Sequence, residues 1–539
     1  MPDARINDLP VIPAYDDDDR VPLVDQSEGV DGTTSQTTLQ NYENARIVPL
    51  TAIGDKAISD SFIVETGSNV TQGQFVSLTP SGEIVPGFAQ RYATPTLITP
   101  VSSGLSSNQT FGRFATSLSE DTVLFVAEDT FEMVVRAATI SGNTITNGTA
   151  TNLDMSAVSS NLLAFFKLNN NLAVLVGNID GTFSMVAITV TGTSISSDIE
   201  TVVLGDTFGG RGHGVALNNT RGVLCYRDAS NVGRVRVFDY ISNSFSLGTL
   251  VSFGQAANQV DSPRIIKMNE SKIVWGWRDI NDNRIRISSA TVDGTTITLD
   301  QGINGIQIAE TARADDHVLD IAYIDEDRFL LVYISQIGGV NDIISGRICT
   351  ISDKEIVLGD IFLINDAEPG GTDSNIHVSA AVFGKNRALI LHSTSSGVSL
   401  VVPLLIRGTR IFAEAAVNFT TVGGGGLHSN DFCMRLTDTK GIVNSQTANT
   451  FAEDAESSVV NFNIPLGIAQ TTATSGNPCT VDVKGISDVH SSLIPGQQVY
   501  ADSSGNLSQN DISRGVDKPV GIAISATEIL ITHKFEDFI

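Results

Sequence analysis

Four residues with recognition chemistry recur at one position of a repeated strand pattern: Arg227, Trp277, Tyr333 and His392. Each lies two residues beyond the apolar core of its strand, where the strand is expected to end. Aromatic rings stack on sugars, and cationic side chains donate charge-assisted hydrogen bonds to acidic groups. The spacing therefore predicts an outward face that binds a sugar or an acidic glycan. The alternative is packing between neighbouring sheets with only the polar tips exposed.

A second set of side chains consists of arginines. Arg136, Arg236 and Arg286 fall at matching positions of the repeat, and Arg234 and Arg284 stand two residues earlier. Because valines and isoleucines alternate with them, these arginines are expected on one face of their strands. The pattern favours a solvated or salt-bridged outer face over an anion-binding stripe.

One segment has the spacing of the first three ligand positions of a calcium-binding loop. Asp279, Asn281 and Asn283 have the spacing of a calcium loop, but Arg284 and Ala290 occupy the positions that need glycine and glutamate. The segment is therefore predicted to be a hairpin turn, and no metal site is expected.

Motifs for catalysis are missing from the sequence. The glycine-rich stretches 209–214 and 423–426 lack a phosphate-binding lysine and a following helix, so they are predicted to be loops. Neither the aspartate-box repeats of sialidases, nor a Gly-x-Ser-x-Gly elbow, nor a His-Glu-x-x-His helix is present. We therefore predict no catalytic residue, no cofactor and no enzymatic activity.

The strands that carry these residues repeat along the chain. Short β-branched runs end at Gly, Asn or Asp, and no window has sustained helical periodicity, which predicts an all-β fold. An aliphatic marker recurs 50 to 59 residues apart, at Leu124, Val174, Leu224, Val274, Leu330, Leu389 and Ile442. Units of this length are typical of a β-propeller, here with seven blades. The last unit is one strand short, so residues 95–102 are expected to pair with the sheet that contains residues 440–445.

A short motif pair flanks this repeat. Gly496-Gln-Gln-Val is followed 23 residues after its glycine by Pro519-Val-Gly-Ile-Ala, whereas Gly73-Gln-Phe-Val is followed 392 residues later by Pro465-Leu-Gly-Ile-Ala. About 369 residues are therefore inserted into the first copy. The sequence predicts an N-terminal segment (1–60), the first part of a small β-domain (61–90), the inserted propeller (91–460), and the rest of the small domain with its two pseudo-repeats (461–539).

Composition excludes several classes of protein. With 41% apolar and 17% charged residues, the 539-residue chain is expected to fold, and its net charge of −27 argues against a nucleic-acid partner. No signal-peptide core and no apolar stretch of membrane-spanning length is present, so synthesis in a cytoplasm without membrane insertion is expected. The four cysteines lie far apart and are predicted to be buried thiols.

The N-terminal segment is polar and cannot bury a core by itself, so we expect another subunit to order it. Its scattered apolar residues are candidates for that contact: Ile6, Leu9, Pro10, Val21, Leu23, Val24 and Leu39. The pattern Ile-x-x-Leu-Pro, then Val-Pro-Leu-Val after an aspartate, then a threonine-rich tract, resembles the N-terminal attachment segment of many bacteriophage tail-fibre and appendage proteins. The flanking motif pairs similarly resemble small β-domains of phage structural proteins.

The resemblance implies a structural protein of the virion. Such a protein docks on other tail or virion proteins through its N-terminus, is often a homotrimer, and displays a distal domain for host attachment. We therefore expect a tail fibre or receptor-binding appendage whose propeller contacts a host surface glycan or protein. The alternatives are a head fibre or capsid decoration with an architectural role, and a propeller glycosidase that would need two carboxylates in a groove.

Overall fold

A computed structural model describes residues 58–531, with internal gaps of which the longest are 87–95, 103–113, 365–377, 422–431, 447–454 and 510–519. Every regular element in the described part of the chain is a β-strand, so the all-β class is confirmed. No helix able to cross a membrane occurs among these residues.

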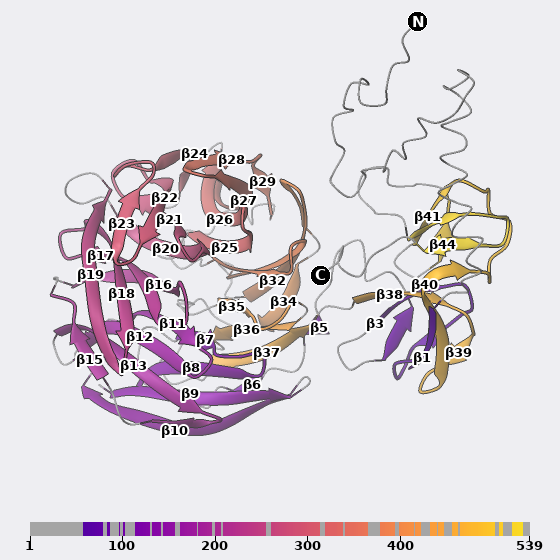
Figure 1. Cartoon of the computed structure of the whole chain (residues 1–539), viewed down its shortest axis with the longest axis horizontal. Coiled ribbons are helices and arrows are strands. Elements are labelled where there is room, and N and C mark those ends of the chain that lie inside the picture. The colour runs from indigo at the N-terminus through magenta and orange to yellow at the C-terminus, as the bar shows by residue number, and fades with distance from the viewer. Residues whose placement is uncertain are drawn as a thin grey trace, which may run out of the picture. The chain divides into compact units, whose positions relative to one another are not determined.

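The described strands between residues 96 and 461 form seven antiparallel meanders, five as separate sheets and two joined in a ten-stranded sheet by pairing of β24 with β26. We call these meanders blades 1 to 7 in chain order (Figure 1). Blade 1 contains β7 (Phe114–Ser117), β8 (Thr122–Asp129), β9 (Glu132–Ser141) and β10 (Thr144–Ser156). Blade 2 contains β11 (Leu162–Asn169), β12 (Leu172–Ile179), β13 (Thr182–Thr191), β14 (Ser194–Ile195) and β15 (Glu200–Val203).

The next three blades follow the same order. Blade 3 contains β16 (Phe208–Ala216), β17 (Arg221–Asp228), β18 (Gly233–Ile241) and β19 (Ser244–Phe253). Blade 4 contains β20 (Val260–Asn269), β21 (Lys272–Asp279), β22 (Arg284–Asp293), β23 (Thr296–Leu299) and β24 (Ile306–Ala312). Blade 5 contains β25 (Leu319–Asp325), β26 (Arg328–Ile337), β27 (Val340–Ser352), β28 (Glu355–Leu358) and β29 (Phe362–Leu363).

The last two blades complete the circle. Blade 6 contains β30 (Val378–Phe383), β31 (Arg387–Ser393), β32 (Val398–Arg407), β33 (Arg410–Ala413) and β34 (Val417–Thr421). Blade 7 contains β35 (Phe432–Arg435), β36 (Lys440–Gln446) and β37 (Ala455–Asn461), together with β5 (Thr96–Leu97) and β6 (Val101–Ser102) from before blade 1. The first strand of each blade contacts the first strand of the next blade, in the order β7, β11, β16, β20, β25, β30 and β35. β35 in turn contacts β7. The propeller is thereby closed.

The expected closing strand is observed. β37 pairs with β5 at Val460 and Leu97, and with β6 at Ser457 and Val101. An N-terminal strand thus completes the last blade, so the outer edge of β37 is paired along part of its length.

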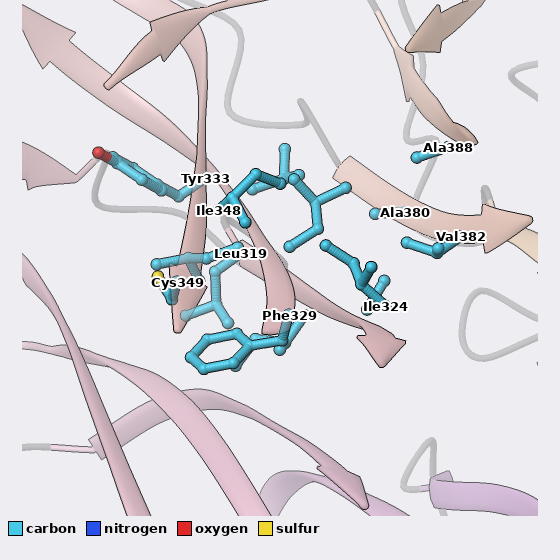
Figure 2. Packing of buried hydrophobic residues seen from close by; sticks show 14 of the residues in the cluster. Leu319, Ile324, Phe329, Tyr333, Ile348, Cys349, Ala380, Val382 and Ala388 are labelled. Atoms are coloured by element: carbon cyan, nitrogen blue, oxygen red, sulfur yellow. The ribbon is translucent and has the colours of Figure 1, made fainter. Parts of the chain in front are cut away.

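Stacked blades bury both faces of their middle strands. In β21, Ile273 to Trp277 are all buried, as are Phe329 to Tyr333 in β26. Figure 2 shows residues of a buried cluster that extends over blades 4 to 6, among them Leu319, Phe329 and Ile348. A strand between two sheet neighbours and two blade neighbours has no solvent side, which explains its continuous apolar sequence.

The two parts of the split module pair directly. It contains β1 (Ile58–Ile63), β2 (Asn69–Val70), β3 (Phe75–Leu78) and β4 (Ile84–Pro86) before the propeller, and after it β38 (Ile464–Ala469), β39 (Ala473–Thr474), β40 (Pro478–Ser487), β41 (Gln498–Ala501), β42 (Leu507–Ser508), β43 (Gly521–Ala523) and β44 (Ile529–Ile531). β3 pairs with β38, setting Phe75 opposite Ile468 and Leu78 opposite Ile464. Strands separated by the whole propeller therefore lie side by side.

The pseudo-repeat is visible in hydrogen bonds. The amide of Gly73 donates to Ala469 O at 2.7 Å, and the amide of Gly496 donates to Ala523 O at the same distance. These two glycines have φ of 83° and 84°, a left-handed conformation that favours glycine. β40 pairs with β38 in one copy and with β44 in the other, which joins both copies in a single sheet.

Candidate functional site

The four predicted recognition residues are not an outward face. Trp277 and Tyr333 are fully buried and His392 is 2% exposed, so the prediction that they face solvent is wrong. Their strands continue beyond them, with β21 ending at Asp279 and β31 at Ser393. Middle strands of a propeller remain covered by the next blade to their ends, which is why the alternative of packing between sheets holds for these three residues.

Aromatic packing accounts for two of these residues. The ring centroid of Trp277 lies 5.0 Å from that of Phe253 in blade 3. The hydroxyl of Tyr333, which belongs to the cluster in Figure 2, accepts a hydrogen bond of 3.2 Å from Arg347 Nε. Binding of a ligand to either ring would require that the blades separate.

Arg227 is one residue out of register with the other three. In blades 2, 4, 5 and 6, the residue three positions before the aliphatic marker lies in a turn, and its carbonyl accepts a hydrogen bond from the third strand. In blade 2 this residue is Asn171 and the marker is Val174. In blade 3 the same hydrogen bond joins Tyr240 N to Thr220 O, so the marker is Val223 and not Leu224. The structural equivalent of Trp277 is therefore Tyr226, which is buried against Phe183 at 5.2 Å.

Arg227 instead takes part in a buried ionic cluster. Its Nη1 lies 3.3 Å from a carboxylate oxygen of Asp261, and its Nη2 donates to Gly209 O at 2.6 Å. Arg278, its true equivalent in blade 4, also donates to Asp261. Asp261 is 1% exposed and lies beside Ser262, whose φ of 46° marks a strained bulge. Two cations from adjacent blades thus share one carboxylate.

The predicted set of arginines has two structural roles, ion pairing with aspartates and hydrogen bonding to carbonyls of the outer strands. Arg234 and Arg286 lie 2.7 Å from the carboxylates of Asp228 and Asp279 respectively, at equivalent positions of blades 3 and 4. Arg236 donates to Gly248 O at 2.9 Å, as Arg347 does to Gly359 O at 2.6 Å in blade 5. The favoured salt-bridged reading is confirmed for Arg234 and Arg286, while Arg236 fastens an outer strand.

Two loop predictions have different outcomes. Asp279 accepts a hydrogen bond from Asn281 N at 3.0 Å, and Asn283 has φ of 52°, so this segment is a hairpin turn as predicted. Residues 209–214 were predicted to be a loop, but they lie in β16, the first strand of blade 3. A side chain at Gly214 would overlap the ring of Phe166, so glycine here permits close packing of two blades. Residues 423–426 lie outside the described part.

A polar arc follows the first strands and is not indicated by any motif. His213, Arg264, Asp320 and Ser379 occupy one register in blades 3 to 6. Their side chains reach the next blade: His213 Nδ1 lies 3.0 Å from Ile265 O, Asp320 accepts from Ala380 N at 2.8 Å, and Ser379 Oγ accepts from Cys433 N at 3.1 Å. The arc satisfies backbone groups at the inner sheet edges.

Burial controls the protonation of this arc. It lowers the pKa of His213 to about 3, helped by the charge of Arg264 and opposed by the hydrogen bond to Ile265. It raises the pKa of Asp320, although Arg264, 4.0 Å away, opposes the shift. The imidazole of His213 is therefore neutral near neutral pH, whereas the pKa of Asp320 moves towards neutrality.

The remaining predictions concern the N-terminal apolar residues, the cysteines and metal binding. Ile6, Leu9, Pro10, Val21, Leu23, Val24 and Leu39 lie outside the described residues, so the predicted anchor remains a prediction. All four cysteines are buried and unbridged, as predicted. Within the described ranges no three His, Cys, Asp or Glu side chains are grouped to hold a metal ion.

Comparisons with known proteins concern the fold alone. No family model and no curated protein matches the sequence. Among solved structures, the WD40 domain of Toxoplasma gondii coronin aligns with 86% of this chain and 100% of its own, at 8% identity and a TM-score of 0.44. AofleA from Arthrobotrys oligospora covers 60% of this chain and 89% of its own, at 8% and 0.38.

A third structure is named as a propeller in its description. The β-propeller domain of the trilobed protease from Pyrococcus furiosus aligns with 68% of this chain and 95% of its own, at 9% identity and a TM-score of 0.35. Because these scores lie below 0.5, we base the propeller assignment on the strand pairing of the chain itself.

Proposed function

We propose that this chain is a structural and adhesive protein of a tailed-bacteriophage virion, a tail fibre or receptor-binding appendage whose propeller contacts the host surface. The observation that carries the proposal is the pairing of β3 with β38, which holds both ends of the propeller in one small module. A domain inserted in this way can be displayed without contributing to the attachment of the chain.

The sequence supports the other half of the proposal. The N-terminal segment resembles phage attachment segments, and the motif pairs of the small module resemble those of small β-domains in phage structural proteins. We therefore assign docking on other virion proteins to the N-terminus and host contact to the propeller. A homotrimer is the assembly that the resemblance favours.

The glycosidase alternative has no specific support from the geometry. The buried carboxylates Asp261 and Asp279 are engaged by arginines. Asp320, whose pKa is raised by burial, accepts hydrogen bonds from Ala380 N and Ile321 N. Retaining and inverting glycosidases both need one carboxyl free to protonate the leaving group. An architectural decoration of the head is the runner-up, because it would need the same anchor without a host ligand.

Imaging of intact particles tests the proposal. Particles labelled with an antibody fragment against the propeller should show label at the tail or at a surface appendage. Label over the head would favour the decoration reading. Absence of the chain from purified particles, measured by mass spectrometry, would contradict both.

A further inference from the structure

One axial end of the propeller carries three cations and no anion at equivalent positions. In each blade, one residue of the first strand pairs with the residue that directly precedes the aliphatic marker of the second strand. In blades 1 to 7 these first-strand residues are Ser117, Lys167, Ala216, Lys267, Tyr323, Val382 and Arg435. We call Lys167, Lys267 and Arg435 the basic collar. In a chain with a net charge of −27, three cations and no anion at one register of the first strands depart from the overall excess of carboxylates.

The collar residues belong to strands that contact one another around the axis. β11 contacts β16, and β16 contacts β20, so Lys167 and Lys267 flank the small Ala216. Lys267 leans over blade 3, where its ammonium donates to Leu217 O. Burial and the carboxylates of Asp325 and Glu326 raise the pKa of Tyr323, and the charge of Arg435, two blades away, opposes them. Charges at this level therefore act on each other across a blade.

The charge of Lys167 is not compensated by the described chain. Its side chain is half-buried, and its ammonium has no hydrogen bond or ion pair to any described residue. Burial lowers the pKa of Lys167, with no carboxylate acting against the shift. Lys267 has only a carbonyl as its partner, whereas Arg435 is paired with Asp438. An ammonium that loses water without gaining a partner costs stability, so an external anion would restore what burial removes.

The turns after the first strands of blades 2 and 3 carry amides, whereas the turn after Lys267 in blade 4 also carries Glu270. Asn169 Nδ2 in blade 2 donates to Asn219 O in blade 3 at 3.0 Å, which links the two turns. The side chains of Asn170 and Asn219 are exposed. Amides both donate to and accept from hydroxyl groups. The turns of blades 1, 4, 5 and 7 carry carboxylates, at 120–121, at Glu270, at 325–327 and at Asp438, and the turn of blade 6 carries Lys385. The turns without charge are therefore those of blades 2 and 3.

We propose that the basic collar binds the anionic group of an acidic saccharide, carboxylate or phosphate, at this end of the propeller. Lys167 and Lys267 supply the charge, and the asparagine turns of blades 2 and 3 bind neighbouring hydroxyls. The inference deepens the proposed adhesive function, on which it rests for the source of the saccharide, a glycan of the host surface.

Calorimetry on the purified full chain tests this site. Trigalacturonate and a sugar phosphate serve as probes, inorganic phosphate as the bare anion, and maltotriose as the neutral control. Binding of trigalacturonate, or of the sugar phosphate alone, supports the site and identifies its anion. Binding of inorganic phosphate as tightly as of either saccharide would overturn the saccharide assignment, and absence of binding by every anionic probe would overturn the proposal.

Charge-removing variants locate the binding. K167M and K267M should each weaken binding by about tenfold, because a charge-assisted contact is lost. K354M removes the same charge from the turn between β27 and β28, away from the first strands, and should leave binding unchanged. Equal weakening in K354M would show a non-specific charge effect and contradict the assignment.

Stability separates a ligand site from a structural lysine. Because Lys167 has no partner, K167M should keep or raise the midpoint of thermal unfolding while it loses binding. A fall in the midpoint that K354M lacks would show that Lys167 supports the fold and would overturn its role. If K167M does not fold, K167Q, which removes the charge and keeps a polar side chain, carries the same comparison. Failure here leaves the virion proposal intact, because particle incorporation is measured without a saccharide.

Discussion

At the scale of single residues, the type of a side chain was a poor guide to its role. Trp277, Tyr333 and His392 have recognition chemistry, yet they lie between blades. The sequence shows which strand holds them but not that a second sheet covers that strand. The one-residue shift of the marker in blade 3 was also invisible, because Val223 and Leu224 are both apolar.

The collar and the polar arc were within reach of the sequence in one respect. Their members lie at fixed offsets from the corrected markers. The arc residues stand ten residues before, as His213 does before Val223, and the collar residues stand seven before, as Lys267 does before Val274. A search for polar residues at fixed offsets from the markers would have found them. Their inter-blade partners, such as Ala380 N for Asp320, depend on how the blades stack and require the structure.

Replacement of Trp277 tests whether this residue is core or ligand platform. Trp277→Ala should lower the free energy of unfolding by about 3 to 5 kcal/mol, because a fully buried ring is removed. Trp277→Phe should cost much less, because the indole N–H has no hydrogen-bond partner among the described residues and its packing is partly kept. Urea unfolding measures both. Equal stability of the alanine variant and the wild type would contradict the packing role.

His213 should make the propeller sensitive to acid. Its pKa is about 3 in the folded chain and 6.5 as its ordinary value, so the unfolded chain binds the proton more readily. The stability contributed by neutral His213 is therefore complete above pH 6.5 and is lost as the pH falls towards 3.

The variant His213→Gln isolates this contribution from that of Asp320, whose raised pKa acts in the opposite direction. Relative to wild type, the variant should gain about 2 kcal/mol on going from pH 7.5 to 4.5. Urea unfolding at both values measures the difference. A difference that does not change with pH would mean that His213 is protonated in the folded chain.

At the scale of elements, strand existence was predicted better than strand edges. The repeat, the closing strand and the split module were all predicted from the sequence, because apolar alternation and turn residues reflect local geometry. The strand β16 was not predicted, because a glycine-rich sequence is typical of loops. In that strand glycine serves the approach of Phe166 from blade 2, a tertiary requirement.

The closing strands should control the exposure of β37. Each of β5 and β6 pairs over two residues, so they add little hydrogen bonding but cover an edge. Deletion of residues 96–102 should raise amide hydrogen exchange in 455–461 by at least tenfold and leave exchange in blade 3 near its original rate. Protection that persists in β37 would show that blade 7 does not depend on this strand.

At the scale of the whole molecule, the proposed function divides the chain into an N-terminal segment for attachment and a propeller for display. The pairing of β3 with β38 and the ring of first strands fix where the propeller begins and ends. Composition and repeats predicted this organisation because both are properties of long segments. The proposed ligand of the propeller does not follow from such long-range properties, because the proposal rests on a few side chains, Lys167 and Lys267 among them.

The most direct test of the account is the incorporation of a truncated chain into virions. Particles are produced with either the full chain or a chain that lacks residues 1–45, and the amount of the chain per particle is measured by quantitative mass spectrometry. We expect the truncated chain to be absent from particles while the purified protein unfolds at the same temperature as the full chain. Normal incorporation of the truncated chain would contradict the assignment of the N-terminal segment as the virion anchor.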